Sequence, residues 1–251
     1  MKLKNSIFCA DDWGLSPGVN AGILELARND LLSSVSCIAN SAYLTQGLSE
    51  LLSYKKNGLQ FHLHFNLTYG SAGVSRSEVS SLTSKNGNFL DSKTLIFKSL
   101  TGQVSRQEVE KIFLHQLEIL KQHNIPVTGL DGHHHVHLLP AVYLSIKHLL
   151  IPNQINTIRT MIDPEHRLSF LQSVYFTRFI FDSDPELVLK PCGYVLAKNL
   201  KSGEIIKEKM SRYSNMIVHP AKLDDFRLCG INDKLQAERL VELKLLMEYF
   251  S

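Results

Sequence analysis

The sequence has few cysteines and no spacing that pairs them. It contains four, Cys9, Cys37, Cys192 and Cys229, and none forms a CxxC motif, so a zinc knuckle or a thioredoxin-like redox site is excluded by spacing. Cys9 and Cys37 lie in apolar, strand-like runs, where a buried thiol is the expected state. This cysteine usage favours a reducing compartment, and we expect a cytoplasmic protein.

Long apolar runs, basic runs and several common catalytic motifs are also absent. No stretch approaches the ~20 apolar residues that span a bilayer, and MKLKNSIFCADDWG at the N-terminus meets two acids too early for a signal peptide. A formal net charge of +3 without any Lys/Arg-rich run argues against a nucleic-acid partner. Motifs such as GxGxxG, GxxxxGK[ST] and HExxH are missing, so nucleotide-dependent phosphoryl transfer and HExxH-type zinc protease chemistry lack their usual residues.

What the 251 residues do contain is an alternation of short apolar runs with helical patterns. The runs predict strands at 6–10, 33–39, 59–65, 127–132, 155–160 and 215–218. Helices are predicted from Pro17 after the N-cap Ser16, at 44–56, from a Ser105–Glu108 capping box to residue 123, at 140–150 and at 234–250. Residues 66–102 are rich in Ser, Gly and Thr and indicate a long functional loop or a small excursion, and 163–203 show no clear pattern. The alternation predicts a parallel sheet or barrel.

Polar clusters follow the predicted strands at the points where active sites form in such folds. The carboxyl ends of parallel strands meet at one rim, and each cluster here comes at or after a predicted strand. They are Asp11-Asp12, His62 and His64, His133 to His137, Arg159, and His219. We therefore expect these side chains to converge on one site.

The densest cluster is DGHHHVH, Asp131 to His137. On an extended segment Asp131, His133, His135 and His137 would share one face and His134 would lie opposite. Imidazole and carboxylate ligands suit a divalent metal such as zinc. Because a catalytic zinc takes about three protein ligands and keeps one position open, not all four histidines can be ligands.

Two acids, Asp11 and Asp12, follow the first predicted strand. Neighbouring side chains on a strand point in different directions, so one acid could bind a metal while the other acts as a base toward water. An acidic turn that favours the N-terminus of the next helix is an equally simple interpretation. For the HxH pair His62 and His64, one ligand is favoured over two.

Two further residues have alternative interpretations. His219, at the end of Met216–Val218 and before Pro220, could act as a general acid or could cap the strand end by a backbone hydrogen bond. Arg159, at a strand end, could hold a carboxylate or bind a substrate oxygen, or it could form a surface salt bridge.

Four motifs together resemble the YdjC-like carbohydrate deacetylases, a family of N-acetyl sugar deacetylases. They are ADDWGLSPGVNAGI (10–23), HFNLT (64–68), DGHHHVH (131–137) and VHPA (218–221). The resemblance implies a distorted (β/α) barrel related to polysaccharide deacetylases, in a single domain of residues 1–251 with a variable excursion at about 69–102. It also implies hydrolysis of an N-acetyl group with one divalent metal ion, Zn²⁺ being favoured and Mg²⁺ compatible.

The resemblance also implies roles for individual residues. Asp12, His64 and His133 would bind the metal, Asp11 would be the catalytic base, and His219 would lie near the leaving group, although which group is the general acid stays open. Contacts to the substrate or support of the ligands would come from Arg159, His135, His137 and Asn66. The chain departs from the family at His62, where a small residue, often Gly, is usual, at Gly132 in place of serine, and at Trp13, where Phe is commoner.

The substrate implied by the resemblance is an N-acetylated sugar, either chitooligosaccharide-like or a lipid-linked N-acetylhexosamine. A lipid-linked substrate would bring peripheral membrane contact, and a homodimer is compatible with the sequence. Two functions from other classes stay open: a metal-dependent phosphoesterase, and a non-catalytic sugar-binding protein. Release of acetate or of phosphate would distinguish the first from the deacetylase.

Overall fold

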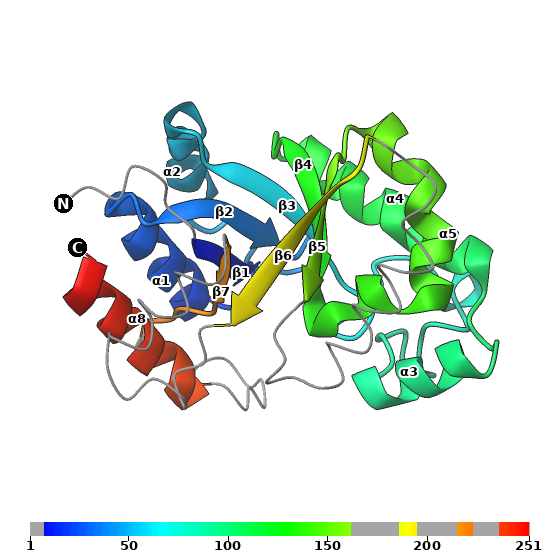
Figure 1. Ribbon diagram of the computed structural model, residues 1–251. Coiled ribbons are helices and arrows are strands. Elements are labelled where there is room, and N and C mark those ends of the chain that lie inside the picture. The colour runs from blue at the N-terminus through cyan, green and yellow to red at the C-terminus, as the bar shows by residue number, and fades with distance from the viewer. Residues whose placement is uncertain (1–7, 162–185, 195–214, 223–235, 251) are drawn as a thin grey trace. The chain divides into compact units, whose positions relative to one another are not determined.

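The strands are parallel wherever their pairing is described, and they follow one another in chain order around a closed barrel (Figure 1). The computed structural model describes residues 8–161, 186–194, 215–222 and 236–250. Its strands are β1 Phe8–Trp13, β2 Leu32–Cys37, β3 Gln60–Phe65, β4 Val127–Gly132, β5 Thr157–Met161, β6 Val188–Tyr194 and β7 Met216–Val218. The predicted (β/α) barrel is thereby confirmed.

Helices connect the strands, as the alternating sequence pattern predicts. They are α1 Pro17–Arg28, α2 Leu48–Ser53, α3 Ser92–Leu100, α4 Arg106–Gln122, α5 Pro140–Leu150 and α8 Gln236–Phe250. Over the described residues, no helix has the length and apolar character that crossing a membrane requires. The segment 163–203, which shows no clear pattern in sequence, lies mostly outside the described residues, as does Cys229.

Helix starts were predicted with mixed success. Ser16 caps α1, since its Oγ accepts a hydrogen bond from the Val19 backbone N–H at 3.2 Å. The capping box at Ser105 is wrong: Ser105 makes no side-chain cap bond, because the Glu108 carboxylate instead accepts from the backbone N–H of Ser81 at 2.7 Å. The glutamate ties the excursion after β3 to α4, and this excursion carries α3.

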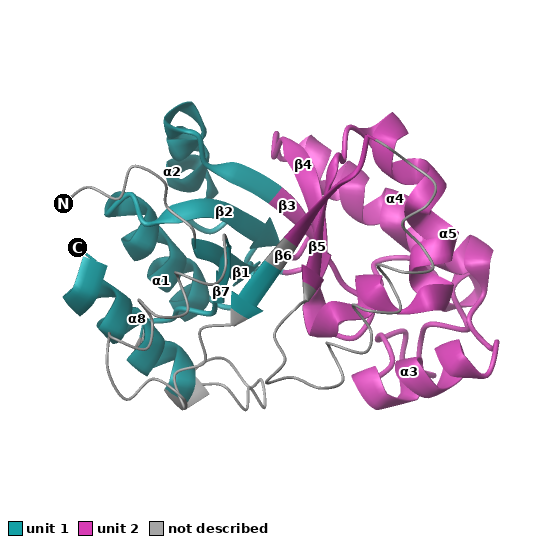
Figure 2. Cartoon of the chain, viewed as in Figure 1, with its two compact units in different colours: residues 1–37, 42–61, 191–251 teal, residues 38–41, 62–190 magenta. Residues whose placement is uncertain are grey.

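Backbone contacts divide the chain into two compact units (Figure 2). Unit 1 comprises residues 1–37, 42–61 and 191–251, and unit 2 comprises residues 38–41 and 62–190. β3 and β6 each pass from one unit into the other along the chain. The assignment of 1–251 to a single domain stays a prediction.

In unit 1, β1 lies between β2 and β7, and its side chains are fully buried. Trp13 is completely buried and its indole N–H donates to the carbonyl of Leu44 at 2.9 Å, so the larger ring at this position keeps its polar atom paired. The same unit packs α1 against α8. α1 also contacts β1, and its buried residues include Val19 and Ile23.

In unit 2, β4 pairs with β5 in parallel, and α4 packs beside α5. Phe65 at the end of β3 meets Phe113 of α4 edge-to-face, with ring centroids 5.5 Å apart. Both rings are buried to 1% exposure or less. This aromatic pair contributes about 0.5–1.5 kcal/mol beyond simple burial and anchors the strand that carries His62 and His64.

Candidate active site

The backbone of β1 changes conformation at Asp11 and Asp12. The pairing of β1 with β2 shifts register between Ala10 and Trp13, and Asp12 adopts a left-handed conformation with φ 72°. A bulge of this kind re-aims side chains near active sites, and a left-handed non-glycine residue is often found where function requires it. Both carboxylates are nearly completely buried, with 1% and 2% of their surface exposed.

The two acids have different partners within unit 1. Asp12 accepts a charge-assisted hydrogen bond from Arg239 on α8, with Nη2 2.6 Å from Oδ2. Asp11 faces His219 instead, and its Oδ2 lies 3.9 Å from His219 Nε2. Asp12 thus contacts a guanidinium and Asp11 an imidazole, and a carboxylate can accept from more than one partner.

The loop that carries His219 is fixed by its backbone. The His219 N–H donates to Glu242 Oε1 of α8 at 2.7 Å, and the Lys222 N–H donates to the carbonyl of Gly18 at 2.9 Å. Gly22 of α1 lies so close that an added Cβ would be 2.7 Å from the Ala221 Cα. This loop can therefore approach α1 only because residue 22 has no side chain.

The carboxyl group of Glu242 is held in its neutral form. Burial raises the pKa of Glu242 to about 8, although the hydrogen bond from His219 and the charge of Arg239 oppose the shift, and Asp11 adds to it. At neutral pH the group is therefore mostly a protonated acid beside Asp11.

Replacing Glu242 by Gln is expected to make stability less dependent on pH. The pKa of Glu242 is about 8 in the folded protein against an ordinary value of 4.5. The protonated carboxyl group therefore stabilises the parent fully below pH 4.5, and this stabilisation is lost as pH rises toward 8. The loss amounts to roughly 1.4 kcal/mol per pH unit at most. Urea unfolding at pH 5 and pH 8 measures the free energy of unfolding of both proteins. If the Gln variant gains no stability relative to the parent between pH 5 and pH 8, the carboxyl group of Glu242 is not neutral.

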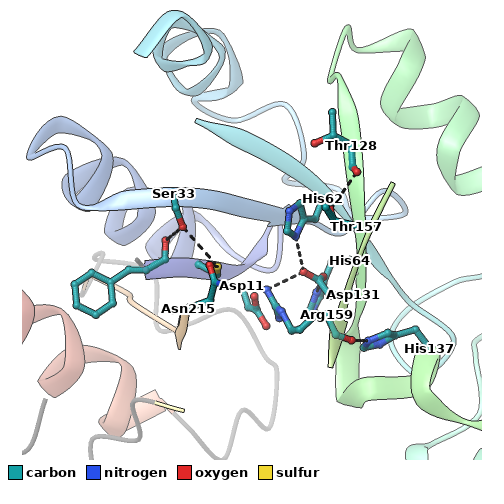
Figure 3. Close-up of polar contacts among 12 residues, drawn as sticks. Asp11, Ser33, His62, His64, Thr128, Asp131, His137, Thr157, Arg159 and Asn215 are labelled. Carbon is teal, nitrogen blue, oxygen red and sulfur yellow. Dashed lines mark hydrogen bonds and ion pairs between the residues drawn. The ribbon is translucent and has the colours of Figure 1, made fainter. Parts of the chain in front are cut away.

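In unit 2 the polar side chains gather around Asp131, at the end of β4 (Figure 3). Its Oδ1 lies 2.7 Å from His64 Nδ1, and its Oδ2 lies 3.1 Å from His62 Nδ1 and 2.7 Å from Arg159 Nη2. Asp131 has no exposed surface. The prediction of a buried arginine that holds a carboxylate fits Arg159, and the surface salt bridge does not.

The charges around Asp131 keep its carboxyl group ionised. Burial alone would raise the pKa of Asp131, but the Arg159 guanidinium and the hydrogen bonds from His62 and His64 outweigh it and hold the pKa well below 3.8. An ionised carboxylate can only accept hydrogen bonds. His64 therefore carries a proton on Nδ1, which leaves Nε2 as the ring nitrogen that a metal ion could bind.

His62, the departure from the family pattern, packs into the sheet. Its Nδ1 bonds to Asp131, and its ring lies against Gly129 of β4, where an added Cβ would come within 2.4 Å of His62 Cδ2. His62 is 3% exposed, and its Nε2 has no hydrogen-bond partner among the residues that the structure describes. The absence of a side chain at residue 129 makes room for the imidazole, so the geometry gives His62 the role of a second donor to Asp131.

Gly129→Ala is expected to destabilise the protein by about 1–3 kcal/mol, because the new methyl group would displace the His62 ring. In the double variant with His62→Gly the methyl group has room, so the combined loss should be smaller than the sum of the two single losses by 0.5 kcal/mol or more. Urea unfolding of the four proteins gives this coupling energy. Strictly additive losses would mean that the ring and residue 129 do not compete for space.

The histidine cluster is a turn and not an extended segment, which corrects the sequence interpretation. A 3₁₀ turn spans His133–Leu138, and both His134 and His135 have left-handed backbones with φ 52° and 56°. The alternation of faces is therefore lost. His133 lies beside His64, with ring centroids 5.6 Å apart, and His134 Nδ1 lies 2.9 Å from the hydroxyl of Thr68.

His137 forms a hydrogen bond with the backbone carbonyl of Arg159. It is fully buried, and burial lowers the pKa of His137 to about 4 even though its bond to the Arg159 carbonyl opposes the shift. The neutral ring donates from Nε2 to that carbonyl, 3.0 Å away. The ring lies close to Gly132, where an added Cβ would be 2.8 Å from His137 Nδ1. His135 is partly exposed.

Asn66 organises the loop after β3. Its side-chain oxygen accepts from the backbone N–H groups of Thr68 and Tyr69, both at 3.0 Å, and its amide donates to Asn40 and to the Tyr69 carbonyl. These four bonds use the full capacity of an asparagine amide. Asn66 thus shapes the loop that places Tyr69 next to His133, with ring centroids 5.9 Å apart.

Sequence reasoning missed three residues that shape these groups: Gly129, Arg239 and Glu242. A signal was present for the last two. Arg239, Glu242, Leu243 and Leu246 occupy positions i, i+3, i+4 and i+7 of one buried helix face, and charges within an apolar stripe require buried partners. Gly129 gave no such signal, because the space it leaves is filled from another strand.

The fold and these two groups of residues define the class to which the chain belongs, the YdjC-like protein family, whose pattern matches residues 6–249. The chitooligosaccharide deacetylases of Yersinia pestis and Yersinia pseudotuberculosis are 33% identical over 141 residues, which is 56% of this chain and 53% of each relative. The match thus spans about half the length of these relatives. A solved structure from Enterococcus faecalis, described as a putative cellobiose-phosphate cleavage protein, has a TM-score of 0.71 at 20% identity, covering 97% of this chain and 91% of that one. This likeness shows a shared fold.

Proposed function

We propose that this chain is a metal-dependent carbohydrate N-deacetylase that releases acetate from an N-acetylated sugar. The observation that carries the proposal is the division of partners between the two acids: Asp12 is held by Arg239 at 2.6 Å, whereas Asp11 lies 3.9 Å from His219. A hydrolase with one metal ion needs this separation of a ligand from a base. Family membership and the names of the curated relatives support the same reaction.

Asp12, His64 and His133 would hold the metal ion. They offer one carboxylate oxygen and two imidazole nitrogens, a donor set that suits a catalytic Zn²⁺ with one open position, with Mg²⁺ as the alternative. The tautomer of His64, fixed by Asp131, fits a ligand. When bound, the ion supplies Lewis-acid polarisation of the acetyl carbonyl and lowers the pKa of water. Asp12 lies near the carboxyl end of β1, His64 near that of β3, and His133 directly follows β4; the carboxyl ends of strands share one rim in a (β/α) barrel.

The side chains of this chain would divide the proton transfers. Asp11 would accept a proton from the attacking water as the new C–O bond forms. His219, beside Asp11, would return a proton to the amine as the C–N bond breaks. Arg159 would support the site by pairing with Asp131, and His137 by bonding to the Arg159 carbonyl. Asn66 would hold the loop that carries Tyr69. His134 and His135 lie on the turn that follows β4.

The proposed substrate is an N-acetylhexosamine, either in a chitooligosaccharide-like chain or linked to a lipid. The reduced cysteines Cys9, Cys37 and Cys192, all buried thiols, support a cytoplasmic location for the reaction. A lipid-linked substrate would add contact with a membrane surface.

The experiment combines metal analysis with a product screen. Purified protein loaded with Zn²⁺ or Mg²⁺ is incubated with N-acetylated sugars, free and lipid-linked, and acetate release is measured beside phosphate release from phosphomonoesters. Acetate release that needs the metal supports the proposal. Phosphate release alone would identify a phosphoesterase, and stoichiometric metal without turnover of any substrate would favour a non-catalytic sugar-binding protein.

A further inference from the structure

Helix α8 carries two charged residues on its buried face. Arg239 and Glu242 are each 2% exposed, and they share that face with Leu243 and Leu246, which are 8% and 0% exposed. Burying an arginine or a glutamate is unfavourable unless each polar group finds a partner. The partners show what the helix does.

Two neighbouring buried residues of α8 contact Asp12 of the acid pair and the backbone of His219. The guanidinium of Arg239 holds Asp12 Oδ2 at 2.6 Å, and both side chains are almost fully buried, at 2% and 3% exposure. One turn further along, Glu242 Oε1 accepts the backbone N–H of His219 at 2.7 Å. The Arg239 carbonyl also accepts the N–H of Ala221 at 3.4 Å. The helix thus fixes the acid pair and the His219 loop from a single side.

We propose that Arg239 and Glu242 are positioning residues, Arg239 for Asp12 as a metal ligand and Glu242 for His219 as a proton donor. This inference rests on the proposed function. Arg239 occupies one oxygen of Asp12 and so directs the other oxygen toward a cation. Glu242 fixes the main chain at residue 219 and so keeps the imidazole beside Asp11.

The charge of Arg239 and its positioning of Asp12 should have opposite effects on metal affinity, which makes the inference testable. A guanidinium beside a ligand repels a divalent cation, so removing only the charge would tighten metal binding. If positioning is the larger effect, removing the side chain weakens binding, as loss of the groups that orient a ligand usually does, by about 10–100-fold. The sign of the change in affinity therefore separates the two roles.

Glu242 offers a matched pair of substitutions. Glutamine copies the shape and the charge of the neutral acid and keeps a carbonyl oxygen for the His219 N–H, whereas leucine keeps only the volume. A role through that hydrogen bond predicts that Gln restores function and Leu does not. A role in bulk packing predicts that both are tolerated.

The test uses the full chain with Arg239→Met, Arg239→Lys, Glu242→Leu and Glu242→Gln. Lys244→Met and Glu248→Leu on the exposed face of α8 serve as controls, since their side chains are 76% and 53% exposed. The dissociation constant for Zn²⁺ alone is measured by competition with a chelator, and kcat and KM are measured on the acetylated sugar that the parent hydrolyses best. Circular dichroism establishes that each variant is folded.

We expect Arg239→Met to weaken Zn²⁺ binding about tenfold or more and Arg239→Lys to weaken it about threefold or more. Glu242→Leu should lower kcat tenfold or more with KM and Zn²⁺ affinity nearly unchanged, and Glu242→Gln should recover kcat to within about threefold. Should a Met or Leu variant fail to fold, the Lys and Gln variants decide.

Unchanged or tighter Zn²⁺ binding in the Arg239 variants would overturn the role of Arg239. A Glu242→Gln variant as impaired as Glu242→Leu, or a Glu242→Leu variant as active as the parent, would overturn that of Glu242. A parent that releases no acetate refutes the proposed function and with it the role of Glu242 in proton donation, while the Zn²⁺ measurement still decides the role of Arg239. Failure of the two proposals is thereby distinguishable.

Discussion

Asp11→Asn is expected to lower kcat by two to four orders of magnitude while Zn²⁺ affinity stays within about threefold of the parent. An amide has almost the shape of the carboxylate but cannot accept a proton, and loss of a general base typically has an effect of this size. Asp11 is the acid that faces His219, and Arg239 bonds to its neighbour Asp12. The base and the ligand should therefore respond separately to substitution.

The measurement is kcat on an acetylated sugar together with Zn²⁺ titration of the same preparation. Asp12→Asn is the matched control, since it changes the adjacent carboxylate by the same atoms and should lose both metal and activity. Loss of bound metal in Asp11→Asn would make Asp11 a ligand and reverse the division of labour. Full activity in Asp11→Asn would remove the base from the mechanism.

Asp131→Ala is expected to reduce stability by about 3–5 kcal/mol, because it leaves the buried Arg159 guanidinium without its carboxylate. The same change frees the His64 ring to take either tautomer and should weaken Zn²⁺ binding by about 10–100-fold. Urea unfolding and Zn²⁺ titration measure the two effects. Asp91→Ala, at an exposed helix cap that binds Lys93 and Thr94 N–H groups, is the control and should lose only about 1 kcal/mol.

The effect at Asp131 should depend on pH in a defined direction. The pKa of Asp131 is lowered in the folded protein, so its contribution is complete above about pH 4, the ordinary value of the group. It is lost as pH falls through the folded-state pKa. The gap in stability between parent and Asp131→Ala should therefore narrow only in strong acid, and a gap that closes already at pH 6 would contradict an ionised Asp131.

The neutral double variant Asp131→Leu/Arg159→Met tests the same interaction without a stranded charge. Replacing both partners of a buried ion pair by apolar side chains is often close to neutral. It should therefore be more stable than Asp131→Ala, although His62 and His64 still lose an acceptor. A double variant as unstable as the single one would assign the loss to the histidines and not to Arg159.

The sequence predicted those elements whose ends carry strong local signals. The bounds of β4 and α5 were predicted without error, because Gly132 ends the first and Pro140 begins the second at the position that proline favours. The grouping of Asp131 with the histidines was also visible. Its role was not, because that role depends on Arg159, a partner that only the pairing of β4 with β5 brings close.

The remaining features depend on geometry that a single sequence does not display. Left-handed backbones at His134 and His135 break the alternation that an extended segment would have, and histidine gives no warning of them as glycine would. The amphipathic pattern identified α8, but which charges on it are buried follows from packing against β1 and the His219 loop. Ligand assignments at Asp12, His64 and His133 stay predictions.

The left-handed backbone at Asp12 limits which residues could ever replace it. Glycine, asparagine and aspartate adopt this conformation with least strain, but only aspartate among them brings a carboxylate. Glutamate would supply the charge yet would have to adopt an unfavourable backbone and a longer reach. Position 12 thus requires both a left-handed backbone and a carboxylate. Natural sequence variation at position 12 should therefore be narrower than at Asp11, where φ places no such restriction.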